Sequence, residues 1–458
     1  MKVIICGAGQ VGSNIANYLA VEGNDVTVID SEQSVVTELA QTLDVKSIHG
    51  LASQPSVLEQ AGANEADMLI AVTHADEVNM VACQVAHSIF NVTTKIARVR
   101  AQDYLKPIWA DLFSRDHMPI DVIISPEIEV ARAISRRLQV PGAFNMIPFA
   151  EGKVRLIGVL CEENCPIVNT PLRQLTSLFP DLAIKIVTIS RDDRYFLPTG
   201  DDQLLVGDQA YIVVDEAHIS RAMAAFGHEE PEARRILIVG GGNIGLVLAE
   251  EIENNYPGVT VRIIEYGKER ARFIAQKLPN TTVINGDGLD PAILEEANVG
   301  QTETVVCVTN DDEGNILGSI LAKRYGCQRA ITLINRNTYG PLLSSLGIDA
   351  VVSPKSITAS TILQHVRRGR IRSVHSICDG FAEVIEAEAL ETSSIVNKEI
   401  ENLNLPSGVI IGAIVRQDQI LIPTPDTVIK PLDRVILLST IGQIKKVEKM
   451  FSVRLEFF

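Results

Sequence analysis

The stretch Lys2-Val-Ile-Ile-Cys-Gly-Ala-Gly-Gln-Val-Gly12 places an apolar strand directly before a G-x-G-x-x-G turn, and Arg235-Ile-Leu-Ile-Val-Gly-Gly-Gly-Asn-Ile-Gly245 repeats this arrangement. In such a turn, the bare glycine backbone lets a pyrophosphate approach the N-terminus of the following helix. Each copy is followed by a second strand that ends in an acid, Asp30 or Glu265. A carboxylate there can accept hydrogen bonds from an adenosine ribose, so the sequence predicts two nucleotide sites.

A single G-x-G-x-x-G motif is weak evidence, because glycine turns also close ordinary strand–helix junctions. Here the preceding strand, the amphipathic helix and the acid all occur twice, which favours nucleotide binding, most strongly at the first turn. The second turn leaves three alternatives open: a nucleotide with a 2′-phosphate, ATP or ADP in place of NAD, or a copy kept only for packing. The 2′-phosphate alternative arises from the basic residues around its acid, which are Arg262, Lys268, Arg270 and Arg272.

The internal repeat extends well beyond the glycines. Val72-Thr-His-Ala-Asp-Glu-Val-Asn79 pairs with Val308-Thr-Asn-Asp-Asp-Glu-Gly-Asn315, and Ser125-Pro126 pairs with Ser353-Pro354. Between these anchors, apolar strands alternate with helices, which is typical of a parallel βαβ sheet. We therefore expect an α/β protein with two Rossmann-like, doubly wound parallel-sheet domains.

A small α+β lobe is expected after each of these domains. Phe149-Ala-Glu151 pairs with Phe381-Ala-Glu383, and residues 191–208 align without a gap on residues 416–433 as a strand, a polar turn and a second strand. In the first half we expect a Rossmann-like domain at 1–123, a connecting helix at 124–145 and a small lobe at 146–228. In the second half we expect a Rossmann-like domain at 232–352, a connecting helix at 353–370 and a small lobe at 371–458.

The composition favours a soluble cytoplasmic protein. No apolar run approaches the ~20 residues of a spanning helix, and the N-terminus reads as a strand instead of a signal peptide. The net charge of −16 disfavours nucleic acid and anionic bilayers and favours a protein partner. The seven cysteines lack framework spacing and are expected to be reduced, with Cys161 and Cys165 in a solvent-facing loop. We expect no metal site.

Polar residues follow the third strand of each expected sheet. Thr73 and Thr309 end these strands at the C-terminal edge, where open α/β sheets bind ligands. The acids Asp76, Asp311 and Asp312 begin the next helix, where a capping role and a functional role remain alternatives.

Basic residues distinguish the two halves. Arg98 and Arg100 are expected to share one face of the strand at residues 95–101. Leu333 and Asn335 occupy the corresponding places, though Arg336 follows, so the two sites should differ in ligand or in coupling. A further pair, Arg136-Arg137, is expected at a solvated helix end, with a phosphate clamp as the alternative.

These paired motifs resemble the tandem RCK domains (KTN plus TrkA-C) of the TrkA family, over essentially the whole chain. The resemblance implies a regulator of Trk-type potassium uptake, peripheral on the cytoplasmic face of the inner membrane. It implies a homo-oligomeric ring, expected to be a tetramer, beneath an integral membrane potassium channel of the TrkH or TrkG type. The ring would gate this channel in response to NAD(H) and to ATP or ADP.

The motifs and the resemblance together give the expected cofactor contacts. His74 is a departure, since a small polar residue is expected at that position. In the first half the contacts are Gly7, Ala8, Gly9, Gln10, Val11, Gly12, Asp30, Thr73, His74 and Arg98. In the second half they are Gly240, Gly241, Gly242, Asn243, Ile244, Gly245, Glu265 and Thr309.

No catalytic residue is expected. The enzyme alternative, a tandem NAD-dependent dehydrogenase, is disfavoured because the two small lobes resemble each other and supply no distinct acid or base over a nicotinamide. A ligand sensor that acts on a soluble partner is a further alternative. For a channel regulator, the connecting helices are the expected levers of a population shift.

Overall fold

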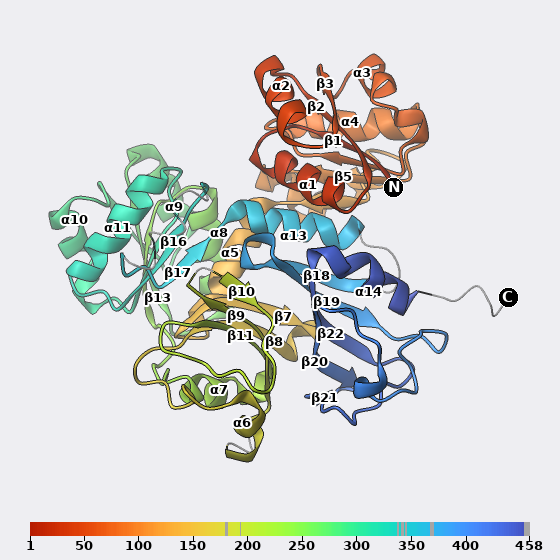
Figure 1. Cartoon of the computed structure of the whole chain (residues 1–458). Helices are drawn as coiled ribbons and strands as arrows, with labels where there is room; N and C mark the ends of the chain where they lie inside the picture. The colour runs from red at the N-terminus through yellow and green to blue at the C-terminus, as the bar shows by residue number, and fades with distance from the viewer. Residues whose placement is uncertain are drawn as a thin grey trace. The chain divides into compact units, whose positions relative to one another are not determined.

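The computed structural model describes residues 1–178, 182–192, 194–336, 339, 343, 346–366 and 371–452. The chain divides into two compact units (Figure 1). The first unit contains Met1–Pro126 together with Lys355–Val366, and the second contains Glu127–Pro354 together with Arg367–Phe458. Among the described residues, no helix combines the length and the apolar character needed to span a membrane.

The first unit is built on a six-stranded parallel sheet in the order β3-β2-β1-β4-β5-β6. This order is that of the dinucleotide-binding Rossmann fold, in which ligands bind at the carboxyl ends of the strands where the winding direction reverses, here β1 and β4. The strands are β1 (Lys2–Cys6), β2 (Asp25–Asp30), β3 (Lys46–His49), β4 (Met68–Ala71), β5 (Thr94–Arg98) and β6 (Val122–Ile124). The helices are α1 (Gln10–Val21), α2 (Gln33–Thr42), α3 (Pro55–Gln60) and α4 (Asp76–Ser88).

Strand β1 is apolar without alternation because both faces of this sheet are covered. Val3 and Ile5 belong to the core on one face, and Ile4 and Cys6 belong to the core on the other. A parallel sheet with helices on both sides requires such strands.

The core of the first unit also contains a helix from the second half of the chain. Helix α13 (Pro354–Val366) contributes Ala359, Ile362 and Leu363 to the cluster that holds Ile15 of α1. The predicted connecting helix of the second repeat therefore completes the Rossmann domain of the first repeat.

The second unit contains the second Rossmann-like sheet, in the equivalent parallel order β14-β13-β12-β15-β16-β17. The prediction of two doubly wound parallel sheets is confirmed. The strands are β12 (Arg235–Val239), β13 (Thr260–Glu265), β14 (Thr282–Asn285), β15 (Thr304–Cys307), β16 (Arg329–Leu333) and β17 (Ala350–Val352). The helices are α8 (Asn243–Asn255), α9 (Lys268–Lys277), α10 (Pro291–Glu296) and α11 (Asp312–Arg324).

Two small antiparallel sheets complete the second unit, in the matching orders β10-β9-β11-β8-β7 and β21-β20-β22-β19-β18. The first is made of β7 (Ala143–Phe149), β8 (Val154–Leu160), β9 (Ile184–Arg191), β10 (Arg194–Phe196) and β11 (Gln209–Asp215). The second is made of β18 (Ile371–Ile377), β19 (Ala382–Glu388), β20 (Val409–Arg416), β21 (Gln419–Leu421) and β22 (Arg434–Thr440). The other α-helices in the described part of the chain are α5 (Pro126–Leu138), α6 (Leu172–Leu178), α7 (Ile219–Ala225) and α14 (Ile444–Phe451).

Short 3-10 helices connect several of these elements. They are η1 (Ala63–Glu65), η2 (Gln102–Leu105), η3 (Pro107–Phe113), η4 (Ala150–Gly152), η5 (Glu216–His218), η6 (Val299–Gln301), η8 (Cys378–Gly380), η9 (Ile400–Asn402) and η10 (Ile441–Gln443). The turn η4 follows β7 as η8 follows β18, and Ala150 and Cys378 both have positive φ, at 50° and 55°. The predicted pairing of Phe149 with Phe381 is therefore wrong by four residues, because Phe149 ends β7 and Phe381 follows η8.

The gapless alignment of residues 191–208 on residues 416–433 is confirmed by one ion pair in each small lobe. Arg191 donates to both carboxylate oxygens of Asp208 at 2.8 and 2.7 Å, and Arg416 donates to Asp433 at 2.9 and 2.7 Å. Both acids are buried. Hydrogen bonding to Asp208 raises the pKa of Arg191, and the same contact with Asp433 raises that of Arg416.

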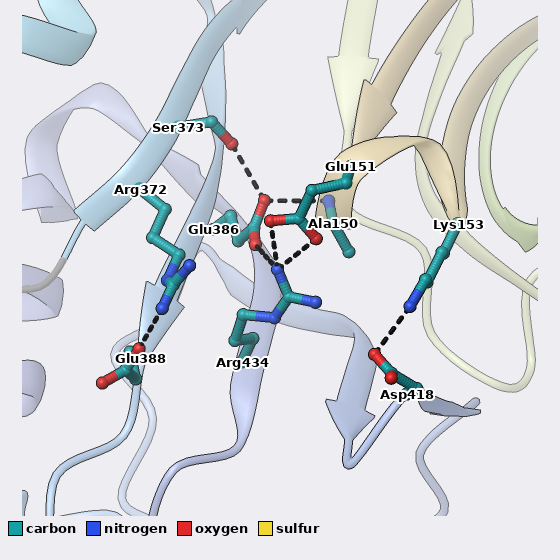
Figure 2. A network of polar contacts seen from close by, with 9 residues as sticks. All are labelled: Ala150, Glu151, Lys153, Arg372, Ser373, Glu386, Glu388, Asp418 and Arg434. Carbon is teal, nitrogen blue, oxygen red and sulfur yellow. Dashed lines mark hydrogen bonds and ion pairs between the residues drawn. The ribbon is translucent and has the colours of Figure 1, made fainter.

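The two small lobes pack together within the second unit. Figure 2 shows Arg434 beside Glu151 and Glu386. Arg434 donates to the two oxygens of Glu151 at 2.8 and 2.6 Å, and the buried Glu386 accepts the amide of Ala150 at 3.0 Å. The hydrogen bond from Arg434 lowers the pKa of Glu151.

Two predictions about exposure are wrong. Cys161 and Cys165 are buried in the core of the first small lobe instead of facing solvent in a loop. Arg137 lies at the end of α5 and donates to the carbonyl of Val351 at 2.7 Å and to the side chain of Asn145 at 3.0 Å. These two bonds engage the half-buried Arg137 within the protein, so it does not lie at a solvated helix end, and burial lowers its pKa to about 10.

Candidate functional site

Two glycines of the first turn are required by the fold. Gly7 has φ of +103°, and a Cβ there would lie 3.0 Å from the backbone of Thr73. A Cβ at Gly12 would overlap the carbonyl oxygen of Gly7. Gly240 and Gly245 have the same constraints in the second half.

The fold does not require the middle glycine of either turn. Gly9 and Gly242 have φ of −63° and −61°, which any residue can adopt. A Cβ at Gly9 would lie 4.0 Å from its nearest neighbour, the ring Nε2 of His74, and a Cβ at Gly242 would have no atom within 4 Å. Both turns therefore keep an open backbone face at the start of a helix, as close approach of a pyrophosphate requires.

The acid after the second strand is held against each turn. Asp30 accepts hydrogen bonds from the amides of Ala8 at 2.6 Å and Glu32 at 2.9 Å. Glu265 accepts hydrogen bonds from the amides of Gly241 and Gly267, both at 2.7 Å. The structure therefore brings each glycine turn and its acid together.

Thr73 and Thr309 are bound to asparagines that the sequence analysis did not single out. The side-chain oxygen of Asn79 accepts the amide and the hydroxyl of Thr73 at 2.8 and 2.7 Å. Asn315 accepts the same two groups of Thr309 at 2.9 and 2.8 Å. The threonine hydrogens are therefore used within the protein, and only hydroxyl lone pairs remain for a ligand donor. The hydroxyl oxygen of Thr309 also accepts the amide of Asp311 at 3.2 Å. The sequence could have indicated these asparagines, because Asn79 and Asn315 are the last residues of the two paired motifs.

The acids at the start of the next helix have two different roles. Asp76 and Asp312 are buried, and each accepts amides from the loop after the neighbouring strand: Arg100 at 3.0 Å for Asp76, and Asn335 at 2.9 Å for Asp312. Asp311 instead caps α11 by accepting the amide of Gly314 at 3.2 Å. Of the two alternatives, the capping role is therefore seen for Asp311, whereas Asp76 and Asp312 hold the loops beside the site.

Arg98 ends β5, and Arg100 lies beyond the strand, so the predicted strand at 95–101 was too long. The carbonyl of Arg98 accepts the side-chain amide of Asn79 at 3.0 Å, and the carbonyl of Leu333 accepts that of Asn315 at 3.0 Å. Leu333 therefore occupies the place of Arg98, as the repeat predicted. Arg98 therefore has no cationic counterpart at its own position, although Arg336 follows in the loop after β16 and donates its amide to Asp312 at 2.9 Å.

The remaining predicted residues lie on the same edge. His74 and Gln10 are exposed, Val11 is half-buried, and Ala8 is buried under the turn. In the second half, Asn243 is exposed and Ile244 is half-buried at the start of α8.

Family models match both halves of the chain in the same order. The TrkA-N domain model matches residues 3–126 and 236–354, and the TrkA-C domain model matches residues 156–227 and 384–452. The fold and the paired sites therefore define a tandem protein of two TrkA-N and two TrkA-C domains.

Two relatives identify the family. A Trk system potassium uptake protein TrkA from Azorhizobium caulinodans is 51% identical, and one from Halomonas elongata is 42% identical, each match covering all of both chains. The chain belongs to the TrkA family of Trk system potassium uptake proteins, which confirms the resemblance. Among solved structures, the GsuK channel bound to NAD has a TM-score of 0.59 at 19% identity, covering 98% of this chain and 78% of that chain. This last likeness concerns the fold alone.

Proposed function

We propose that this chain is a nucleotide-sensing regulatory subunit that gates an integral membrane potassium channel of the TrkH or TrkG type. It acts without catalysis, as a homo-oligomeric ring, a tetramer, held peripherally at the cytoplasmic face of the inner membrane. Membership of the TrkA family supports the potassium-uptake role.

One observation carries the nucleotide part of the proposal. A Cβ added at Gly9 or Gly242 would point into open space, and any residue could adopt the backbone conformation of these glycines. Each turn also holds a carboxylate, Asp30 or Glu265, through a backbone amide. A fold with no ligand would tolerate larger side chains at both positions, whereas a bound pyrophosphate would not. The NAD that is bound to the similarly folded GsuK channel agrees with this reading.

The proposed first site binds NAD(H) through residues 7–12, Asp30, Thr73, His74 and Arg98. The proposed second site binds a nucleotide through residues 240–245, Glu265 and Thr309. We keep the domain boundaries 1–123, 124–145, 146–228, 232–352, 353–370 and 371–458 as part of this proposal.

Helix α13 supplies a route from the first site to the rest of the chain. Its apolar residues share a core with Ile15 and Leu19 of α1, the helix that begins at the glycine turn. The chain enters α13 from the second unit and leaves it for the second unit after Val366. A nucleotide that favours one arrangement of α1 therefore changes the strain on both ends of α13, and only such differential binding can shift the population.

The decisive experiment combines binding with flux. Calorimetric titration of the purified chain with NAD, NADH, ATP and ADP measures the ligands and the number of sites. Potassium flux is then measured in liposomes that hold the channel and the chain, with and without each nucleotide that binds. Nucleotide binding with unaltered flux would contradict gating, and absence of binding would contradict the sensor itself.

A further inference from the structure

The second glycine turn holds an arginine that has no counterpart in the first. The Nε of Arg270 in α9 donates to the carbonyl oxygen of Gly241 at 2.7 Å. A terminal nitrogen of the same guanidinium lies 3.4 Å from the side-chain oxygen of Asn243. Asn243 is the first residue of α8, so the cation lies at the helix end where a phosphate is expected.

The position of Arg270 is fixed by its neighbours. Its guanidinium carbon lies 5.2 Å from the ring centroid of Phe273, one turn further along α9. Glu265, five residues earlier, bonds the amide of Gly241, the residue whose carbonyl Arg270 holds. A carboxylate for a ribose and a cation for a phosphate therefore bond the same residue of the turn, Gly241.

The first half has an apolar residue at this place. Helix α2 begins three residues after Asp30, as α9 begins three residues after Glu265, so Val35 corresponds to Arg270. Val35 is half-buried and packs against the apolar core of the first unit. The cation of the first site, Arg98, instead comes from β5, where the second half has Leu333.

We propose that Arg270 makes the second turn selective for adenine nucleotides with a terminal phosphate, ADP or ATP, over NAD; this inference rests on the proposed function. The two phosphates of NAD are both esterified, so each carries a single negative charge. A terminal phosphate carries additional charge and free oxygens, which a guanidinium fork can bind through two hydrogen bonds. The apolar Val35 offers no such contact to a ligand of the first site.

The test isolates the second site in a full-length chain that carries Gly9→Asp. ADP, ATP and NAD are titrated calorimetrically against this chain, and against the same chain with Arg270→Gln, Arg270→Lys or the control Arg272→Gln. Arg272 is exposed on the same helix, so the control removes the same charge nearby. Thermal unfolding without nucleotide verifies that each variant is folded.

We expect Arg270→Gln to weaken ADP and ATP binding by about tenfold or more and NAD binding by less than about threefold. The dependence of ADP affinity on salt should fall, and Arg270→Lys should keep part of the affinity. Equal losses for NAD and ADP, or no loss for either, would overturn the selectivity. If the unmodified chain binds nucleotides but the Gly9→Asp chain binds none, the inference fails while the proposed function stands. If the unmodified chain binds none, both fail.

Discussion

The side-chain oxygen of Asn79 accepts two hydrogen bonds from Thr73, one from its amide at 2.8 Å and one from its hydroxyl at 2.7 Å. The amide of Asn79 donates to the carbonyl of Arg98 at 3.0 Å. One fully buried side chain therefore ties the loop after β4, which holds Thr73, to the end of β5, which holds Arg98.

Asn79→Ala should lower the free energy of unfolding of the first unit by about 1 to 3 kcal/mol, because it leaves buried donors and acceptors unpaired. Urea unfolding of the full chain, followed by circular dichroism, measures the change. The control is Asn64→Ala, since Asn64 is exposed in η1, and its effect should stay within about 0.5 kcal/mol. Equal stabilities of the two variants would show that the tie between the strands contributes nothing.

Because the chain contains an internal repeat, much of this architecture could be predicted from the sequence. The glycine turns, the acids and the paired motifs lie close along the chain, so local spacing was enough to place them at one sheet edge. The partner of Asp76 and the bond of Asn79 to Arg98 were not predictable in this way, because those partners are backbone groups of another strand and its loop.

The packing of α13 was missed for a similar reason. The apolar pattern of α13 is compatible with packing against either Rossmann-like domain. Only the tertiary structure shows that Ile362 lies in the same core as Ile15. The burial of Arg137 also depends on a distant segment, the carbonyl of Val351, which no local charge pattern reveals.

Asp30→Asn should weaken NAD binding at the first site by about 1 to 3 kcal/mol, because it removes a charged acceptor for the ribose hydroxyls. Ala8 donates to one carboxylate oxygen of Asp30 and Glu32 donates to the other, so the asparagine keeps an acceptor for only one of these amides. Thermal unfolding without nucleotide therefore verifies that the variant is folded. Calorimetric titration measures the affinity, and the exposed Asp44→Asn serves as the matched control. An affinity equal to that of the control would remove Asp30 from the site.

Acid should destabilise the second unit through His375, which packs edge-on against Phe149 with ring centroids 5.3 Å apart. Burial, together with the smaller effect of the nearby Arg136 charge, lowers the pKa of His375 from 6.5 to about 4. Between these values the unfolded chain binds a proton that the folded chain does not, so stability is highest above pH 6.5 and falls towards pH 4. The loss is at most about 3 kcal/mol.

His375→Phe should flatten this part of the profile, and the exposed His117→Asn should leave it unchanged. Guanidinium unfolding of each chain at several values between pH 4 and 7 provides the comparison. A slope that persists in His375→Phe would assign the effect to other groups.

We expect no substrate-dependent hydride transfer, because the two equivalent small lobes offer no separate acid and base over a nicotinamide. Absorbance of NADH is followed while the purified chain is incubated with NAD and panels of alcohols, hydroxy acids and aldehydes. Stoichiometric turnover above roughly 1 s⁻¹ would revive the dehydrogenase alternative.

The two turns should not be equivalent in function, and Gly9→Asp and Gly242→Asp test this directly. Neither aspartate would meet a backbone atom within 4 Å of its Cβ, so both chains should fold. Each carboxylate would occupy its own open turn and repel a phosphate there. Gly9→Asp should abolish the response to NAD(H), since the edge cation Arg98 belongs to the first half.

Gly242→Asp should chiefly change the response to ATP and ADP, because Leu333 replaces that cation while Glu265 still suits an adenosine ribose. Nucleotide affinity is measured by calorimetry, and potassium flux is measured with the channel in liposomes. A matched substitution that does disturb the fold, Gly12→Ala, separates loss of the turn from loss of the ligand, since its Cβ overlaps the carbonyl of Gly7. Identical ligand profiles in the two aspartate variants would contradict a division of labour, and normal flux control in both would contradict gating by these sites.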